Sequence, residues 1–495
     1  MTSPIEYLED ALSILRRDEP RLSMIDDYFK GHHALPYMPD SADQEYFLLA
    51  KRAITNWCPL LVSTPSQALY VDNFRRSGEK SIDAKVSPEW RHWQDSRMDA
   101  RQASVYTSAL EFGHSFVITR KNDEGKVISQ GLSPLRTVTL YDDPAIDLDP
   151  VAGVYVKRWP RDVRTLDGTE GKPGEALVAD DRNFYEVEFW NGKQGPEVVA
   201  QYAHGATQCP ITRFTAYVDL EGRAWGVVEP IVPLQDRINQ TIFDLLVAQT
   251  YNSFNVRWVT GMAPPFQMTQ AQDGTWVPKV DEENNPIPDK QYLNASRFFY
   301  AQDENVKFGQ LTGGDLKGFI DSAELAIRHL SATTQTPPHF LLGQIANVAA
   351  DALEAAETSL MRKVEEFRNS FGESWERVFR VAMEMLGEDG MDDSLGEVIW
   401  RDLTVSSLSQ VADGLGKFAE ALEIPKKGLW SRVPGVTRQE LSEWSDLKDE
   451  EDKQLQIMQK AMGVMPNTGT STGQKFGASA KSQMMAGTNG QPAAA

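Results

Sequence analysis

Two runs of apolar residues at helical spacing flank a proline-containing break between positions 316 and 386. Before the break, Leu316, Ile320, Ala323, Ile327 and Leu330 recur every three or four positions, which predicts one apolar stripe on a helix. The same period continues after it, in Leu353, Ala356, Leu360, Val364, Phe367, Phe371, Trp375 and Val378. Unbroken from 348 to 386, this second helix would be about 55 Å long. A helix of that length needs a partner surface along all of it.

The break itself is set by Pro337 and Pro338. Proline removes a backbone donor and pushes the preceding residue out of the α region, so the first helix is predicted to end there. Gly343 and Asn347 then favour a loop that bends sharply before the second helix begins.

The first half of the chain mixes helical and strand patterns. Residues 4–30 predict an amphipathic helix or helix pair ending at Gly31, and 46–61 and 90–112 give further helical patterns. Strand-like runs occur at 69–71, 113–119, 135–141, 152–159, 184–190 and 211–217, with Asp-, Gly- and Pro-rich turns between the later ones. The fold class predicted for this half is α+β with a mainly antiparallel sheet.

The remaining segments differ in character. Residues 262–310 carry prolines and short aromatic or β-branched runs, which predict a small module of strands and turns inserted between two helices. Runs at 398–400 and 403–405 predict strands that return after the long helix, and 409–422 and 437–462 predict helices. From Val464 onward the composition predicts a disordered tail, because small and polar residues dominate.

Charge and cysteine usage narrow the function classes. A formal net charge of −21 argues against a protein that grips nucleic acid through many phosphate contacts. It fits either simple solubility or an acidic wall past which DNA slides without sticking. Only Cys58 and Cys209 occur, far apart, so we expect neither a disulfide framework nor a thiolate metal site. No signal-peptide pattern and no run of membrane-spanning length occurs, so we expect neither secretion nor membrane insertion.

Candidate chemistry is sparse. None of the seven histidines lies in a metal-binding or catalytic motif, and His329 and His339, beside the proline break, are interpreted as packed or solvent-facing residues at helix ends. No P-loop, dinucleotide fingerprint or nucleophile elbow occurs. Asp315 is interpreted as a helix cap that would repel a phosphate at Gly313 and Gly314. We therefore expect no enzyme activity and no cofactor.

One acidic cluster leaves an alternative open. Asp142, Asp143, Asp147 and Asp149 have carboxylates at the short spacing that suits Mg²⁺ or Ca²⁺, as in a metal-dependent nuclease or hydrolase. The Asp-Pro pairs are also ordinary turn chemistry, and no EF-hand register follows. A metal-dependent activity that Asp143→Asn abolishes would support the enzyme.

Charged residues on the two central helices also have two interpretations. Lys317, Arg328, Arg362, Lys363 and Arg368 fit a solvated helix face. The alternative is that they face neighbouring subunits or DNA phosphates.

Three stretches carry a resemblance to a known family. The run Ser331–Gly343 (SATTQTPPHFLLG) is followed by Asn347 and by 349–353 (AADAL). Upstream, Trp225–Pro230 precedes 234–239 (LQDRIN), and 109–113 (ALEFG) joins a helix to a strand. Together these resemble the siphophage-type portal proteins of tailed double-stranded DNA bacteriophages. The alternative within virion proteins is a capsid or adaptor subunit.

The resemblance implies a domain order. The portal fold would comprise an α/β wing (1–224), a first stem helix (225–261), a small inserted α/β clip (262–312) and a second stem helix (313–335). A tunnel loop (336–350), a long kinked wing helix with return strands (351–405), a helical crown (406–463) and the tail (464–495) would complete it.

The resemblance also implies a role and its residues. A dodecameric ring at one capsid vertex would be the channel for packaging and ejecting DNA, assembled in the host bacterial cytoplasm. Its partners would be the major capsid protein, scaffold, the terminase large subunit and head–tail adaptors, with no membrane. The candidate tunnel-loop residues are Thr336, His339, Phe340, Leu341, Leu342, Gln344 and Asn347, and the candidate stem residues are Gln235, Asp236, Asn239, Lys317 and Arg328.

Overall fold

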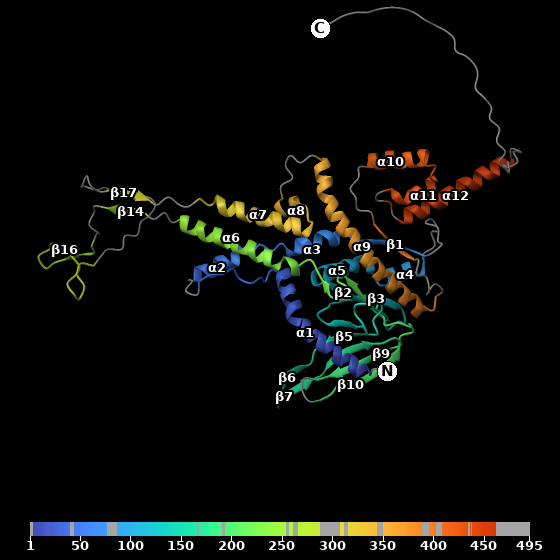
Figure 1. The fold of residues 1–495 in the computed structure, drawn as a ribbon, viewed down its shortest axis with the longest axis horizontal. Coiled ribbons are helices and arrows are strands. Elements are labelled where there is room, and N and C mark those ends of the chain that lie inside the picture. The colour runs from blue at the N-terminus through green and yellow to red at the C-terminus, as the bar shows by residue number, and fades with distance from the viewer. Residues whose placement is uncertain are drawn as a thin grey trace, which may run out of the picture. The chain divides into compact units, whose positions relative to one another are not determined.

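The computed structural model divides the chain into two compact units (Figure 1). One spans Met1–Lys80 and Lys85–Thr404, and the other Ser81–Ala84 and Val405–Ala495. The structure describes residues 3–39, 44–76, 87–165, 168–190, 194–253, 257–260, 266–287, 307–310, 315–343, 350–388, 396–401, 408–433, 436 and 438–461.

The N-terminal helices begin and end where local chemistry dictates. α1 (Pro4–Lys30) is a single helix with a Ser3–Glu6 capping box, and it ends at Gly31 in the left-handed region (φ 84°), as predicted. The pattern at 46–61 is divided into α2 (Gln44–Ala53) and α3 (Cys58–Gln67). The pattern at 90–112 is divided at Arg97 (φ 55°) into α4 (Pro88–Asp95) and α5 (Met98–Phe112). Single helices were therefore the wrong prediction at both places.

Two antiparallel sheets form the middle of the first unit. The larger has the order β10-β9-β8-β5-β4 and the smaller β11-β2-β3. Their strands are β2 (His114–Lys121), β3 (Val127–Leu132), β4 (Thr137–Leu140), β5 (Ala152–Arg158), β8 (Gly174–Ala179), β9 (Asn183–Phe189), β10 (Glu197–Ala203) and β11 (Ile211–Thr215). Each predicted strand run from 113 to 217 overlaps one of them, whereas β3, β8 and β10 were not predicted. Smaller pairs are β6 (Arg161–Thr165) with β7 (Gly168–Lys172), and β12 (Tyr217–Val218) with β13 (Ala224–Trp225).

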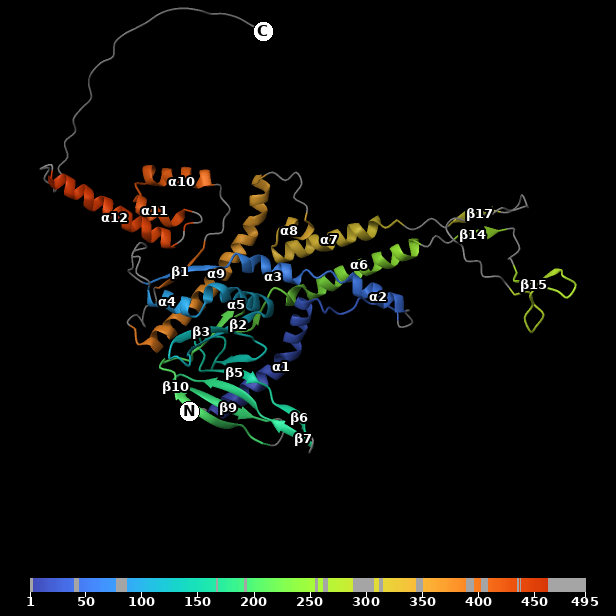
Figure 2. The same cartoon turned by 180° about the vertical axis from the view of Figure 1, so that it is seen from behind.

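The layers of the first unit follow from which faces of its helices and sheets are apolar. Leu8, Leu12 and Leu15 of α1 pack on one face of the larger sheet, against Val154 and Val178. A second apolar cluster lies between the two sheets, with Phe116 and Ile118 on one side and Leu177 and Phe184 on the other. The smaller sheet in turn contacts α5 and α9 (Ala350–Leu386). The order is thus helix, sheet, sheet, helices (Figure 2).

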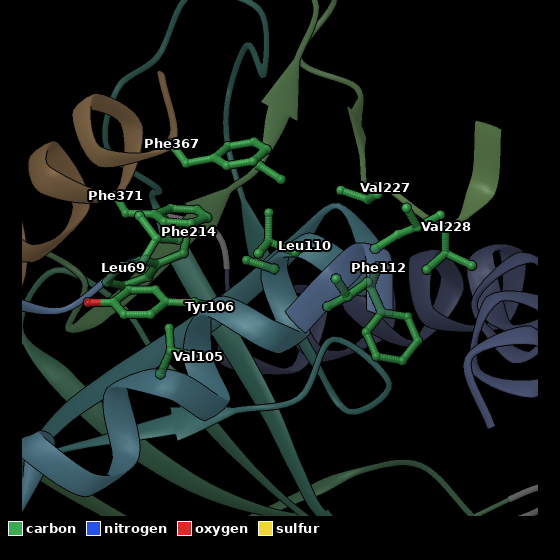
Figure 3. Packing of buried hydrophobic residues seen from close by; sticks show 14 of the residues in the cluster. Leu69, Val105, Tyr106, Leu110, Phe112, Phe214, Val227, Val228, Phe367 and Phe371 are labelled. Carbon is green, nitrogen blue, oxygen red and sulfur yellow. The ribbon is translucent and has the colours of Figure 1, made fainter. Parts of the chain in front are cut away.

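The long helix α9 holds the largest apolar cluster of the unit. It runs 37 residues without interruption, about 55 Å, close to the predicted length. Phe367, Phe371 and Trp375 are fully buried, as the stripe predicted. Trp375 meets Trp93 edge to face at 4.9 Å, and its indole N–H donates to the Tyr106 hydroxyl at 2.8 Å. Figure 3 shows Phe367, Phe371 and Phe214 packed over Tyr106 and Leu110 of α5.

A strand that follows α9 in the sequence pairs with a strand from the N-terminal part of the unit. β18 (Glu397–Trp400) pairs antiparallel with β1 (Val71–Arg75), so the prediction that 398–400 returns as a strand is confirmed. The run 403–405 lies outside the described residues. The predicted kink of α9 stays a prediction, and the helix has no proline to cause one.

Two helices lie side by side around the insertion (Figures 1 and 2). After a short 3₁₀ turn (Glu229–Ile231), α6 (Val232–Ser253) packs against α7 (Lys317–Thr334). The two are antiparallel, because Arg237 near the start of α6 meets His329 near the end of α7, with Nη2···Nδ1 at 3.3 Å. β14 (Arg257–Thr260) pairs with β17 (Lys307–Gln310), and β15 (Met268–Gln270) with β16 (Trp276–Pro278). The described part of 262–312 thus contains strands and no helix.

The second unit is helical where it is described. It contains α10 (Leu408–Ala421), α11 (Lys426–Leu429), a 3₁₀ turn (Trp430–Arg432) and α12 (Arg438–Ala461). The helices predicted at 409–422 and 437–462 are confirmed. Trp430 and Trp444 meet edge to face at 6.2 Å. The predicted disordered tail lies outside the described residues.

Candidate functional site

A buried polar cluster fixes the start of α6. Gln235 and Asn239, one helical turn apart, are 0% and 1% exposed. Gln235 Nε2 donates to the Thr55 carbonyl at 2.7 Å and to Asn239 Oδ1 at 3.0 Å. Its Oε1 accepts from the Trp57 backbone N–H at 3.1 Å, while Asn239 Oδ1 accepts from the Thr55 N–H at the same distance. These amides satisfy the backbone between α2 and α3, which otherwise would be buried without partners.

The end of α1 joins the same cluster. Asn239 Nδ2 donates to His33 Nδ1 at 2.9 Å, and His33 Nε2 lies 2.9 Å from the Tyr28 carbonyl. This arrangement requires the neutral His33 tautomer with the proton on Nε2. The Tyr28 hydroxyl donates to Asp236 Oδ1 at 2.7 Å, and burial raises the pKa of that hydroxyl. Asp236 and Asn239 therefore clamp α6 to the end of α1 and the residues just after it, while Gln235 holds the segment between α2 and α3.

The end of α7 is fixed by a lysine from α9. Lys363 is 5% exposed, and its Nζ donates to the Thr334 carbonyl at 3.0 Å and lies 5.9 Å from the centre of the Phe367 ring. Burial lowers the pKa of this ammonium from 10.5 to about 8. The last carbonyls of a helix attract positive charge, so Lys363 caps α7 from outside. The Ser331 hydroxyl adds a bond to the Thr336 carbonyl at 2.6 Å.

The segment after α7 begins with a short helix, α8 (Pro338–Leu342). Thr336 and Leu341 are 2% and 4% exposed, and Leu341 belongs to the main apolar core. Phe340 is 40% exposed. His339 Nε2 lies 3.8 Å from Glu357 Oε1 on α9. Leu342 is half-buried, whereas Gln344 and Asn347 lie outside the described residues.

Charges on the outer side of the helix pair are exposed. Lys317 is solvent-facing at the first turn of α7, and Arg328 forms an exposed pair with Glu324 at 3.5 Å. The Asp315 carboxylate accepts from the Lys317 backbone N–H at 2.9 Å, in agreement with a capping role. Solvation was the wrong interpretation for two other residues: Lys363 is buried, and Arg368 donates to the carbonyls of Ala68 and Arg401, each at 3.0 Å.

The acidic cluster forms a turn and an ion pair. Asp143 Oδ1 accepts from the Ala145 N–H at 3.0 Å, and Asp147 Oδ2 from the Asp143 N–H at 2.7 Å. Asp149 instead pairs with the buried Arg377 of α9. No group of three or more His, Cys, Asp or Glu residues in the described ranges is arranged to hold a metal ion. The carboxylates of Asp143, Asp147 and Asp149 are thus used in turn hydrogen bonds and an ion pair.

Across the same described ranges, no helix is both long enough and apolar enough to cross a membrane. The feature that distinguishes the unit is instead the succession of an antiparallel helix pair with an insertion at its tip, a short loop helix and a long buried helix. A family model described as "Phage portal protein, SPP1 Gp6-like" matches residues 10–454.

This chain belongs to that phage portal family. It is a portal protein of a tailed phage, and such proteins are part of the virion head. It is similar to the portal protein of Mycobacterium phage D29, with 24% identity over 378 residues, covering 72% of this chain and 71% of the relative. It is also similar to the portal protein of Mycobacterium phage L5, with 25% identity over 382 residues and the same coverage, 72% and 71%.

Among solved structures, this portal chain is similar to a chain in the neck of an empty gene transfer agent particle computed with C6 symmetry. The identity is 12% and the TM-score 0.41, over 79% of this chain and 94% of that one. It is also similar to a chain of the native gene transfer agent virion, with an identity of 13% and a TM-score of 0.40, over 83% of this chain and 100% of that one.

Two buried cations on the portal's long helix were not predicted to be internal: Arg377 was not singled out from the sequence, and Lys363 was interpreted as solvated or as facing another subunit or DNA. Lys363 and Arg377 both occur in a helix pattern rich in charge, where a solvated face is the usual interpretation. The available signal was position: Arg377 directly precedes the apolar stripe residue Val378, and Lys363 precedes Val364. Each therefore lies at the edge of the buried stripe.

The polar clamp at the portal's α6 is open to a direct test. Asn239→Ala removes an acceptor for two donors and the partner of His33, so we expect it to lower the free energy of unfolding by about 2 kcal/mol. Thr241→Ala on the same helix is the control, because it removes only a hydroxyl bonded to the Arg237 carbonyl. Chemical denaturation of both variants at one protein concentration measures the difference. Equal midpoints would show that the cluster does not stabilise the fold.

Proposed function

We propose that this portal chain forms a dodecameric ring in which the α6–α7 pair is the stem around the DNA channel. The support is the order of elements inside the family match over 10–454: helix, insertion, antiparallel helix, loop, long helix. The insertion 262–312 is then the clip, residues 336–350 the tunnel loop, and residues 406–463, in the second unit, the crown.

The partners follow from this assignment. The clip meets the terminase large subunit during packaging and head–tail adaptor proteins afterwards, while the wing contacts the major capsid protein and scaffold. The ring stands at one capsid vertex of the virion and assembles in the host bacterial cytoplasm. The chain acts as a channel and docking hub, without catalysis.

The succession from α6 to α9 carries this proposal, and electron microscopy tests it. Negatively stained protein at high concentration and moderate salt is expected to give rings with an axial hole and a mushroom-like side view. A compact closed dimer without a channel would overturn the assignment.

The loop would contact DNA by position and not by base identity. Its first residues are unsuited to that role, because Thr336 and Leu341 are buried within their own chain. Phe340 and, beyond it, Gln344 and Asn347 are the proposed contacts. The bonds from Lys363 to Thr334 and from Ser331 to Thr336 hold the base of the loop.

Shortening the loop is expected to separate assembly from DNA transport. Removal of residues 344–347 leaves Leu341 in the core, so rings should form in normal yield while packaging of DNA into heads falls. Removal of 340–347 also takes away Leu341 and should reduce stability in addition. Microscopy of the rings and the yield of DNA-filled heads are the two measurements. Loss of rings on removing 344–347 alone would contradict the loop assignment.

A further inference from the structure

A basic cleft opens between the two sheets and α5. Its volume is about 740 Å³, and its wall includes the apolar side chains of Val105, Ile118 and Leu177, which are 3%, 2% and 1% exposed. Leu132 of β3 continues this apolar floor. Hydroxyl groups from Ser104, Ser108, Ser133 and Tyr155 also line it. A cleft of this size and lining suits an occupant with an apolar body and polar edges.

The charged residues that line the cleft are all basic. Arg101, Arg120 and Lys157 belong to the lining, which contains no Asp or Glu. Lys157 pairs with Glu186 at 2.8 Å, and Arg120 donates to Gln130 at 3.2 Å. Arg101 has no hydrogen bond or ion pair with another described residue. In a chain of net charge −21, this local excess of positive charge favours an acidic occupant.

The same chain presents a matching projection, which we call the acidic knob: residues 142–148 and 219–222. Its large aliphatic side chains are unusually exposed, with Ile146 at 75% and Leu148 and Leu220 at 92% each. Asp142, Asp147 and Glu221 lie beside them in sequence. Apolar side chains held this far into solvent are typical of an interaction site.

The acidic knob is fixed in shape. Asp143 and Asp147 close its first turn through backbone bonds, and Asp149 anchors the turn to Arg377. The second turn lies against the first, because a Cβ on Gly222 (φ 74°) would come within 2.3 Å of the Pro144 carbonyl oxygen. An ordered projection loses little entropy on docking.

The acidic knob does not reach the cleft of its own chain. It precedes β5, whose Tyr155 and Lys157 line the cleft, and the strand extends roughly 10 Å from Ala152 to Tyr155 and roughly 17 Å to Lys157. Asp149 and Asp143 hold the turn at the other end of that strand. A second copy of the chain offers the same projection without this restriction.

We infer that the acidic knob of one subunit docks in the basic cleft of its neighbour, with Ile146 and Leu148 over the apolar floor and the aspartates beside Arg101 and Arg120. Different surfaces of the two copies meet in such a contact, and repetition of it closes a ring. The inference rests on the proposed ring and identifies which surfaces join its subunits.

Disulfide trapping tests the contact directly. Leu148→Cys combined with Ser133→Cys places a thiol on the knob and another on the cleft lining. The native Cys58 and Cys209 are buried and do not compete. Mild oxidation of assembled rings is expected to give a ladder of linked subunits on a non-reducing gel. Leu148→Cys with Leu325→Cys, an exposed position on α7, is the matched control and should give no ladder.

Charge reversal gives an independent measurement. Arg101→Glu with Arg120→Glu, or Asp142→Lys with Glu221→Lys, is expected to raise the concentration needed for ring formation by about tenfold or more. A chain with all four changes should again form rings at the concentration of the unmodified chain, because the charges at every contact are then reversed but complementary. Rings that form without the 148–133 link and tolerate each reversal would overturn the contact while leaving the portal ring intact. Absence of rings in the unmodified chain would instead contradict the proposed function.

Discussion

Replacing Arg377 by methionine is expected to lower the free energy of unfolding of the first unit by about 2–4 kcal/mol. The guanidinium is 6% exposed and donates from Nη1 to the Thr212 hydroxyl at 2.7 Å, from Nη2 to the Cys209 carbonyl at 2.9 Å, and from Nε to Asp149. Methionine has similar length but no donor. The variant would therefore leave two buried acceptors without partners and Asp149 without its counter-charge.

The effect is measurable by chemical denaturation followed through tryptophan fluorescence. Trp375, two residues away, is fully buried and bonded to Tyr106, so its emission should report the loss of packing. Arg362→Met is the matched control, because Arg362 is exposed on the same helix, and it should change stability by less than about 0.5 kcal/mol. All samples need one protein concentration, since oligomerisation adds apparent stability.

Arg377→Lys refines the result. Lysine retains a charge near Asp149 but lacks the planar fork that reaches Thr212 and Cys209 together. An intermediate loss is expected. If Arg377→Met were as stable as the unmodified chain, Arg377 would not be the anchor of α9, and the ordered shape of the acidic knob would need another cause.

The sequence predicted the parts of this fold that depend on local pattern. The stripe through Phe367, Phe371 and Trp375 predicted a buried helix of nearly the observed length, because a 3.6-residue period over so many turns has one interpretation. Gly31 marked the end of α1 for a similar reason, since the left-handed conformation there favours glycine.

The breaks inside the predicted helices were not found in this way, although Pro59, the second residue of α3, was an available signal for the first of them. The segment between α2 and α3 is stabilised by Gln235 and Asn239, which lie about 180 positions away in the chain. Arg97 takes a left-handed conformation that the sequence does not favour. In both places tertiary contacts override a continuous helical pattern.

The candidate site was predicted by motif and not by side-chain placement. The resemblance located the helix pair and the loop, yet Thr336 and Leu341 are buried and Gln235 and Asn239 form internal bonds. A motif records which residues recur together, while their orientation depends on partners such as Lys363 and His33. For the same reason, Asp149 belongs to an acidic cluster that suggested a metal site, whereas in the structure it forms an ion pair with Arg377.

Replacing Glu111 by glutamine is expected to stabilise the protein in alkaline solution and to have little effect in acid. Glu111, near the end of α5, is 6% exposed, and its Oε1 is buried without a hydrogen-bond partner. Burial raises the pKa of this carboxyl from 4.5 to about 8; the nearby Asp26 charge acts in the same direction, and Lys30 opposes it. The folded protein therefore keeps a proton that the unfolded chain releases.

The sign of the pH dependence follows from that proton. Between pH 4.5 and about 8 the unfolded chain binds fewer protons at Glu111 than the folded protein, so stability falls as pH rises through this window. Glutamine does not titrate, and the variant should gain about 2–4 kcal/mol over the unmodified protein by about pH 9, with near equality at about pH 4.

Urea midpoints of both proteins across that range measure the difference. Glu373→Gln, at an exposed position of α9, is the control and should give a small difference that does not change with pH. If the gain of Glu111→Gln were the same at every pH, the carboxyl would not be held neutral by burial. A gain that grows through the window would instead identify Glu111 as a buried acid whose ionisation lowers the stability of the first unit.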